Sequence, residues 1–381
     1  MNSPIVALGS SSSDKGISYT RGVRLALMLI FASACGRTPW IRHACKWSLA
    51  SGRDAIAYVE DAGVVLRRDG RDIRVGRTGC LAREGRVDGI VALRDGWSAL
   101  AYGYDVTGGN WIESGAVHDS FACVVDFRSG ASRSVEPELL SRDLRHFDAT
   151  VGARTGWLYV HEIARPVRVI DLDGRSATLP EAGKTIVEID TTIRTIEGRL
   201  EQTDPKLPIY RSTLVVRDYD AAVWPPALRA TREIAVGGRT DRTVVSADGR
   251  WVAYDGSPYH VEDGVHHAVG DLGLVDLASG KIAFEALARP GAVHAGDLIS
   301  RGDAVWVLAS TAPDLSDVHT ASWLDRTGAQ VGAAVRTRSS RLVWLPSRSR
   351  VLVDNLCSLE LIDLPPPSAP PVTGRTGAPG P

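Results

Sequence analysis

The densest group of side chains able to do chemistry lies between residues 259 and 271, where three histidines stand among carboxylates. Imidazole and carboxylate groups this close together are ligands for a transition metal if the segment folds back on itself. Solvated loops of the same composition are far more common than metal sites, so we predict no metal here. The group consists of His260, Glu262, Asp263, His266, His267 and Asp271.

Three catalytic or metal-binding patterns are incomplete or absent. His161 and Glu162 begin a zinc-peptidase motif, but Arg165 stands where the second histidine is needed. Asp171 and Asp173 begin like a calcium loop, but a basic residue follows where a third oxygen ligand is needed, so a hairpin turn is the better explanation. The Gly-x-Ser-x-Gly motif of serine hydrolases does not occur. We predict no catalytic residue and no cofactor.

Two connections carry aromatic and ionisable residues and are predicted to form a partner-binding surface. They are Gly103–Asp119, which has a glycine-rich backbone, and Ser257–Gly270. Aromatic side chains exposed on loops are typical anchors for a partner, although packing of Trp111 beneath its own sheet is an equal alternative. The candidate residues are Tyr104, Asn110, Trp111, His118, Tyr259, His260, His266 and His267.

The charge balance excludes one class of partner. The 44 Lys and Arg residues nearly cancel the 45 Asp and Glu residues, which gives a formal net charge of −1. A polyphosphate needs a positive surface field. We therefore predict no binding of nucleic acid.

Residues 21–35 have the organisation of an export signal. Arg21 and Arg24 precede an apolar run that ends in small residues before Cys35. A helix of about ten residues spans about 15 Å, half of a hydrocarbon core, so the run is a signal peptide and not a membrane span. Residues 32–35 resemble the bacterial lipobox, which implies a lipid on Cys35. Gly36 after it implies the outer membrane or periplasm; a soluble secreted product is the alternative.

One pattern recurs seven times, at a mean spacing of about 49 residues: an apolar run, an aspartate, and a turn rich in Gly or Ser. A second apolar run precedes most copies, so each unit reads as several short antiparallel strands. We predict an all-β fold, a seven-bladed β-propeller of four-stranded antiparallel blades; an open sandwich is the alternative. The recurring aspartates are Asp69, Asp126, Asp171, Asp218, Asp276, Asp325 and Asp363.

Residues 246–254 and 274–281 resemble the WD40-like repeat of TolB-type propellers, in which Ser-Pro-Asp-Gly opens a blade and an apolar strand ends in Asp before a Gly turn. Here Ala247 replaces the usual proline, and only this blade matches closely. The resemblance covers roughly residues 45–364 as a fold. It implies loops for protein contact and no fixed activity.

Ring closure is predicted to depend on the N-terminal segment. A proline run follows Asp363, so no strand can end the last blade there. We expect Pro39–Cys45 to supply that strand, which brings Cys45 beside Cys357 as a disulfide; free thiols or a Cys45–Cys80 bond are the alternatives. The predicted organisation is a signal peptide over 1–35, a propeller over 36–364 and a disordered tail over 365–381.

The predicted function is an exported, lipid-anchored binding or scaffold module for an envelope protein or glycan. We expect a monomer whose only membrane contact is its lipid. The alternative is an envelope enzyme, a lyase or glycosidase, with its site in the central funnel. The innermost runs carry mostly Ala, Ser, Val and Thr, which favours binding over catalysis.

Overall fold

The computed structural model describes residues 40–42, 44–50, 52–60, 63–82, 86–106, 118–135, 147–162, 165–171, 173–202, 210–256, 259–262, 265–313, 318–355 and 357–368. The chain divides into two units, residues 1–38 and residues 39–381, and every described residue belongs to the second. Cys35 and most of the predicted tail therefore lie outside the described residues. Within those residues, no helix has the length and apolar character needed to cross a bilayer.

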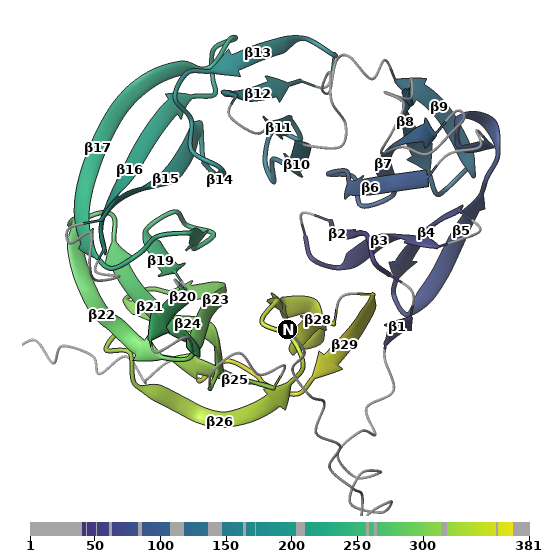
Figure 1. Ribbon diagram of the computed structural model, residues 1–381. Coiled ribbons are helices and arrows are strands. Elements are labelled where there is room, and N and C mark those ends of the chain that lie inside the picture. Colours follow the sequence, from purple (N-terminus) through teal and green to yellow (C-terminus); the bar gives the residue numbers. More distant parts are fainter. Residues whose placement is uncertain are drawn as a thin grey trace, which may run out of the picture. The chain divides into compact units, whose positions relative to one another are not determined.

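Seven antiparallel sheets form the blades of a ring (Figure 1), which confirms the predicted seven-bladed propeller. In each blade the first strand lies nearest the axis and the fourth lies at the rim. The blades are numbered here in chain order.

The strand bounds of the first four blades are as follows. Blade 1 contains β2 (Trp47–Leu49), β3 (Ala55–Glu60), β4 (Gly63–Arg68) and β5 (Arg71–Gly76), and blade 2, after the short helix η1 (Gly79–Ala82), contains β6 (Arg86–Ala92), β7 (Ser98–Val106), β8 (His118–Asp126) and β9 (Ala131–Val135). Blade 3 contains β10 (Phe147–Val151), β11 (Leu158–Glu162), β12 (Val167–Ile170) and β13 (Ser176–Leu179), and blade 4 contains β14 (Thr185–Ile189), β15 (Thr192–Gln202), β16 (Tyr210–Asp220) and β17 (Ala227–Gly237).

The remaining three blades complete the ring. Blade 5 contains β18 (Arg242–Val245), β19 (Trp251–Gly256), β21 (Val265–Asp276) and β22 (Lys281–Pro290). In addition, β20 (Tyr259–Glu262) pairs with the first four residues of β21. Blade 6 contains β23 (Ala292–Arg301), β24 (Ala304–Ala312), β25 (His319–Leu324) and β26 (Gln330–Thr337). Blade 7 contains β27 (Leu342–Leu345), β28 (Arg350–Asp354), β29 (Ser358–Ile362) and β1 (Ile41–Arg42), with the short helix η2 (Pro346–Arg348) after β27.

The apolar core of the described residues is divided among the seven blade junctions. Each junction holds its own cluster of buried side chains, drawn from the facing sheets of two neighbouring blades. Where it lies between two neighbouring blades, the second strand of a blade is buried on both faces; all six residues of β19, for example, are buried. A strand covered on both faces has to be apolar throughout, which explains the uninterrupted runs in the sequence.

Five of the seven recurring aspartates lie at the turns between the third and fourth strands: Asp69, Asp126, Asp171, Asp276 and Asp325. Asp363 follows β29 and forms an ion pair with Arg350 at 2.8 Å instead, because the fourth strand of blade 7 is β1. The Asp126 carboxylate accepts hydrogen bonds from the Ser129 hydroxyl at 2.7 Å and the Arg128 backbone N–H at 2.9 Å. These bonds hold the pKa of Asp126 below its usual value. Asp171 likewise accepts from the backbone N–H groups of Asp173 and Arg175 and is part of a turn.

One assignment in the repeat is wrong by two residues. In blade 4 the turn aspartate is Asp220, which accepts a hydrogen bond from the Ala222 backbone N–H at 2.9 Å. Asp218 lies within β16 and forms an ion pair with Arg194 at 2.7 Å. The strands of blade 4 are longer than the repeat suggests, and this length displaces the turn along the sequence.

The N-terminal segment closes the ring, as predicted. In β1, Ile41 pairs with Leu359 and Arg42 with Ser358, so the chain's first described strand is the rim strand of the last blade. Trp40 lies next to this strand, with the guanidinium groups of Arg67 and Arg348 over its ring at 5.3 and 4.8 Å. At the other end, the buried Trp323 indole donates to the Leu364 carbonyl at 2.9 Å.

A polar latch reinforces the same closure. Arg53, in the turn after β2, forms an ion pair with Asp297 of β23 and donates to the Trp344 carbonyl of β27 at 3.0 Å. The Asp297 carboxylate also accepts from the backbone N–H groups of Trp344 at 2.9 Å and Leu298 at 2.8 Å. Blades 1, 6 and 7 therefore share one buried carboxylate.

Two cysteine pairs are joined by disulfides in the structure. Cys45 is bonded to Cys357, 312 residues away, beside the β1–β29 pair. Cys80 of η1 is bonded to Cys123 of β8 within blade 2. The second pair was not singled out from the sequence, because four cysteines alone do not define a connectivity.

We predict that the Cys45–Cys357 bond stabilises the folded ring strongly. Cys45→Ser and Cys357→Ser should each lower the melting temperature by the same amount, because either change removes the same bond. Chain-entropy models assign a link across so long a loop on the order of 4–5 kcal/mol. Thermal unfolding of the oxidised protein measures the effect, and the double variant should melt no lower than either single variant. Peptide mapping under non-reducing conditions that finds Cys45 free, or joined to Cys80 or Cys123, would contradict the prediction.

Candidate functional site

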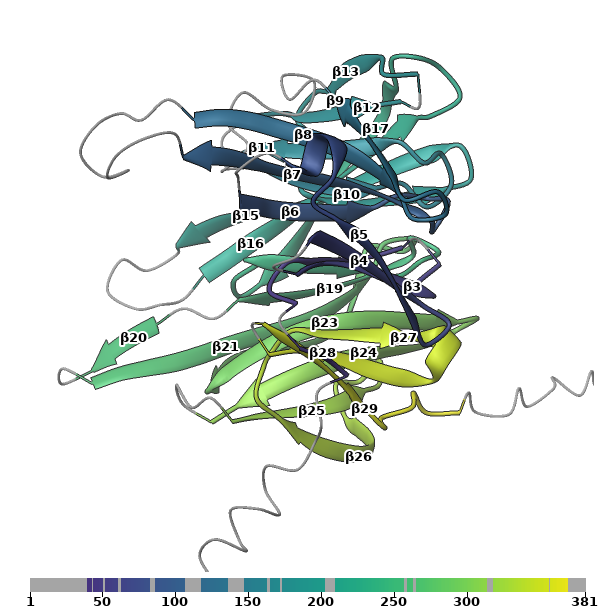
Figure 2. The same cartoon turned by 90° about the vertical axis from the view of Figure 1, so that its right-hand side faces the viewer.

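The described ends of both predicted partner loops lie on one side of the ring. The strand pairs β7–β8, β15–β16 and β20–β21 project on this side (Figure 2), which we call the loop face. Residues 107–117, 203–209 and 263–264 connect their ends. The opposite side, the turn face, carries the short turns that contain the recurring aspartates.

One of the two segments that we predicted to be loops forms a β-hairpin in the structure. Much of the segment 257–270 is in strand: β20 pairs with β21, so that Tyr259 lies opposite Ala268 and His260 opposite His267. His266 pairs with Val261, and in blade 2 Tyr104 and His118 lie on β7 and β8. Asn110 and Trp111 lie outside the described residues. Blades 3 and 4 stand between the two hairpins, so these candidates share a face and do not form one cluster.

The innermost strands carry more charge than we expected from their sequence. We expected mostly Ala, Ser, Val and Thr there, but the strands nearest the axis include four carboxylates and a histidine. The sequence pattern does not reveal the role of a carboxylate in a short apolar run, because that role depends on contacts with the neighbouring blade. These residues are Asp88, Asp148, Glu188, His294 and Asp297.

Two of these carboxylates hold blades together. Asp297 belongs to the latch described above. Glu188 of β14 is buried and accepts hydrogen bonds from blade 3: the backbone N–H groups of Arg154 and Thr155 at 2.6 and 2.9 Å, and the Tyr159 hydroxyl at 2.6 Å. A carboxylate with this many donors is fixed in position. Neither group is available as a catalytic acid or base.

A cluster of ionisable groups lies where blades 2 and 3 meet. Asp148 of β10 stands directly opposite His161 of β11. Burial raises the pKa of the Tyr102 hydroxyl, and the charges of Asp148 and Asp88 raise it further. Lys184, in the connection to blade 4, also acts electrostatically on His161. Only the sheet register could have brought these residues together, since they are spread over about a hundred positions of the chain.

His161 is the buried member of this cluster. Its side chain is 8% exposed, and neither ring nitrogen has a hydrogen-bond partner among the described residues. Burial is the main cause that lowers the pKa of His161; the nearby Lys184 charge acts in the same direction and Asp148 opposes it. The ring is therefore neutral at pH 7. Its nitrogens are covered by protein, so they are not placed to act on a substrate.

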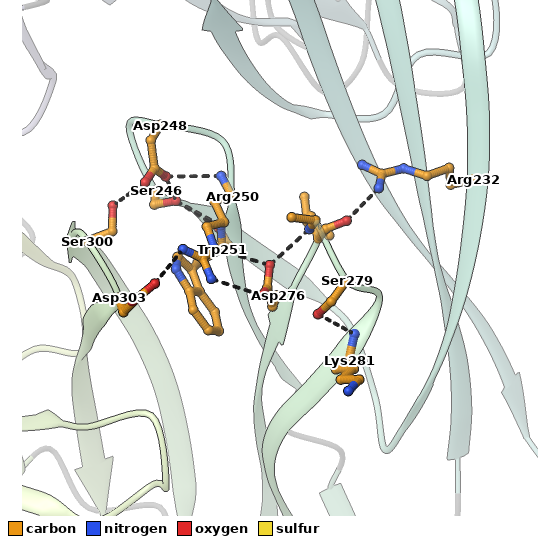
Figure 3. A network of polar contacts seen from close by, with 12 residues as sticks. Arg232, Ser246, Asp248, Arg250, Trp251, Asp276, Ser279, Lys281, Ser300 and Asp303 are labelled. Carbon is orange, nitrogen blue, oxygen red and sulfur yellow. Dashed lines mark hydrogen bonds and ion pairs between the residues drawn. The ribbon is translucent and has the colours of Figure 1, made fainter. Parts of the chain in front are cut away.

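The stretch that most resembles a known repeat is structural. Asp248 accepts from the Ser300 hydroxyl of blade 6 at 2.8 Å (Figure 3). Arg250 forms ion pairs with Asp276 at 3.3 Å and with Asp303 of blade 6 at 3.2 Å. These contacts join blades 5 and 6 on the turn face. In the described part of the chain, no three His, Cys, Asp or Glu side chains gather in a way that could hold a metal ion.

We predict that His161 makes stability depend on pH. Because its pKa in the folded protein lies below the 6.5 of an ordinary histidine, the folded state binds fewer protons than the unfolded state. The free energy of unfolding should be highest above about pH 6.5 and fall as the pH falls. His161→Leu should remove most of the change between pH 7 and pH 5. Urea titrations at several pH values test this, and a wild-type slope retained in His161→Leu would contradict it.

Of the comparisons with known proteins, the one with solved structures finds similar chains. No family model matches the chain, and no curated protein matches it. Solved structures to which the chain is similar include a β-propeller domain, a WD40 domain and Hsv2. The β-propeller domain of Cps50 (Swd1) from Myceliophteria thermophila is 11% identical, with a TM-score of 0.47, 85% of this chain and 98% of that one covered. Hsv2 of Kluyveromyces lactis is 9% identical, with a TM-score of 0.47 and coverage of 84% and 98%.

The C-terminal WD40 domain of Sif2 is 10% identical, with a TM-score of 0.45 and coverage of 87% and 99%. At these identities, and with TM-scores below 0.5, the likeness concerns the fold alone and carries no argument about what this chain binds. The chain is a seven-bladed β-propeller.

Proposed function

We propose that this protein is an exported binding module, attached to the cell envelope by a lipid on Cys35, that engages a protein or glycan partner through its loop face. The proposal has two parts. One concerns the surface that binds, and the other concerns the anchor. They rest on different residues and are tested separately.

One observation carries the binding surface: blades 2, 4 and 5 extend strands beyond the ring on the same side. β15, β16 and β21 have 11, 11 and 12 residues, whereas the strands of blade 3 have four or five. A blade needs only the shorter length to cover its neighbours. In β15 the last four residues, 199–202, are exposed to solvent, which is typical of recognition surfaces on a rigid scaffold.

The polar groups near the axis favour binding over catalysis. Glu188 and Asp297 are occupied by donors from neighbouring blades. His161 is buried with its nitrogens covered. A funnel enzyme needs an acid or base that reaches a substrate, and none of these three side chains is free to do so.

The anchor part of the proposal rests on the sequence. Arg21 and Arg24, the apolar run 25–34 and Cys35 form the pattern of a lipoprotein signal. Because a single acyl chain binds a bilayer only marginally, such an anchor needs the full lipid modification of an N-terminal cysteine. The proposed location is the outer membrane or periplasm.

Shortening the two hairpins should abolish partner capture. In the first change, residues 107–117 are replaced by Asn-Gly between the paired residues Val106 and His118. In the second, residues 260–267 are replaced by Asn-Gly between Tyr259 and Ala268. A two-residue type I′ turn closes an antiparallel pair without distorting it. Pulldown from solubilised envelope, compared with the wild type, measures the loss.

The matched control is the same operation on blade 4, with Asn-Gly in place of residues 203–209 between Gln202 and Tyr210. It should keep the envelope partners that the double-shortened variant loses. All three variants should melt within a few degrees of the wild type, because each Asn-Gly turn closes a strand pair that is already formed. If the double-shortened variant captures every partner that the wild type captures, the assignment of these hairpins fails.

Lipidation is expected to move the protein into a detergent phase. The mature wild type, expressed in a bacterial host that processes lipoproteins, should partition into the detergent phase of Triton X-114, and Cys35→Ser should stay in the aqueous phase. Mass spectrometry of the N-terminal peptide should show the acyl groups. Recovery of both proteins in the aqueous phase would rule out the anchor.

A further inference from the structure

In blade 4, the second strand is longer than the first strand that should cover its inner edge. β15 pairs with β16 along its whole length, but β14 pairs only with the stretch from Thr192 to Ile196. Within the part of the chain that the structure describes, residues 197–201 have no strand on their inner side and no backbone hydrogen bond to another connection there. They form an open strand edge on the loop face.

The backbone groups that point into this opening can be assigned from the register. Thr192 and Ile189 close the two-residue turn between β14 and β15, so Thr192, Arg194 and Ile196 direct their N–H and C=O groups toward β14. The close approach of Gly183 to the Ile196 carbonyl, 2.3 Å from where a Cβ on that glycine would lie, agrees with this direction. No register shift interrupts β15 and β16. The alternation therefore continues, and Gly198 and Leu200 point their backbone groups into the open edge.

The side chains on either face of this edge are exposed. Leu200 is 44% exposed, an unusual exposure for a large apolar residue in a strand. On the other face, Arg199, Glu201 and Arg211 border a hollow of about 340 Å³ with Thr213 and Ala235 among its lining residues.

We propose that this edge binds an extended polypeptide segment of a protein partner, which adds a strand to blade 4 beside residues 197–201. The inference rests on the proposed function and narrows it, because it names the class of partner. Backbone donors and acceptors that repeat every second residue are matched by another extended backbone and not by a glycan. The alternating side chains of the added segment then meet Leu200 on one face and the charged hollow on the other.

The position of the open strand edge favours a single extended segment over a bulkier partner. β14 lies nearest the axis, so the open edge faces the interior of the ring (Figure 1). The strand pairs β7–β8 and β20–β21 project on the same side (Figure 2). A single strand needs only about 5 Å beside its neighbour, whereas a second copy of the ring would have to enter between these projections. Segments that bind should alternate apolar residues with charged ones.

The test separates backbone pairing from side-chain contact at one position. Leu200→Pro removes the N–H that faces the open edge and leaves the hydrogen bonds to β16 in place, because proline is tolerated where the strand N–H is unpaired. Leu200→Ala keeps that N–H and removes the exposed side chain. Linear 12-residue peptides displayed on phage are selected against the full-length wild-type protein, and the selected peptides are synthesised and titrated against all three proteins.

Leu200→Pro is expected to weaken the peptides roughly tenfold or more, the equivalent of about 1.4 kcal/mol, and Leu200→Ala by a smaller factor. Hydrogen exchange on the wild type gives a readout that needs no variant. The bound peptide should protect the amides of Gly198 and Leu200, while the amides of Arg199 and Glu201 are already protected by β16.

Three results would overturn the proposal: no peptide of micromolar affinity, equal binding to Leu200→Pro and wild type, or no new protection at Gly198 and Leu200. Self-association of the wild type that Leu200→Pro abolishes would assign the edge to a second copy instead. Partner capture that is lost in the double-shortened variant and kept in Leu200→Pro leaves the proposed function standing and rejects this edge. The reverse pattern rejects the two hairpins and keeps the edge.

Discussion

The last blade junction is the interaction on which the rest of the structure depends. Every blade in this chain is a thin sheet with apolar side chains on both faces, so each of the seven clusters needs two blades to exist. If blade 7 did not meet blade 1, two sheet faces would be exposed to water at once. A two-residue strand, a disulfide, a stacked tryptophan and a shared carboxylate all lie at this closure.

Polar side chains in this ring mainly set the angles between blades. Glu188 and Asp297 each accept two backbone N–H groups, and the backbone cannot shift without leaving a buried donor unpaired. The apolar clusters favour contact between blades but are tolerant of small rotations. A carboxylate that spans a junction removes that tolerance for the two blades that it joins.

The fold could be predicted because its repeat can be read along the chain. The groups near the axis could not be predicted, because the pairing register of the strands decides which of them become neighbours. Apolar runs and turn aspartates repeat along the chain, and the need to close the ring pointed to residues 39–45. By contrast, Asp148 and His161 become neighbours only once β10 and β11 are paired. The same limit explains Asp218, where a long strand displaced the turn, and the open edge of β15, which exists because β14 ends early.

The position of the Cys45–Cys357 bond has a mechanical consequence. β1 is held to β29 by only two residue pairs, so tension applied to the chain ahead of Trp40 would peel it away. The disulfide lies just after this strand and transfers such a load directly to the start of β29. Blade 1, which follows in the sequence, is then shielded from the pull. A load on an N-terminal anchor of the kind proposed would therefore stop at this covalent bond, and the pairing of β1 with β29 would be kept as long as the bond is intact.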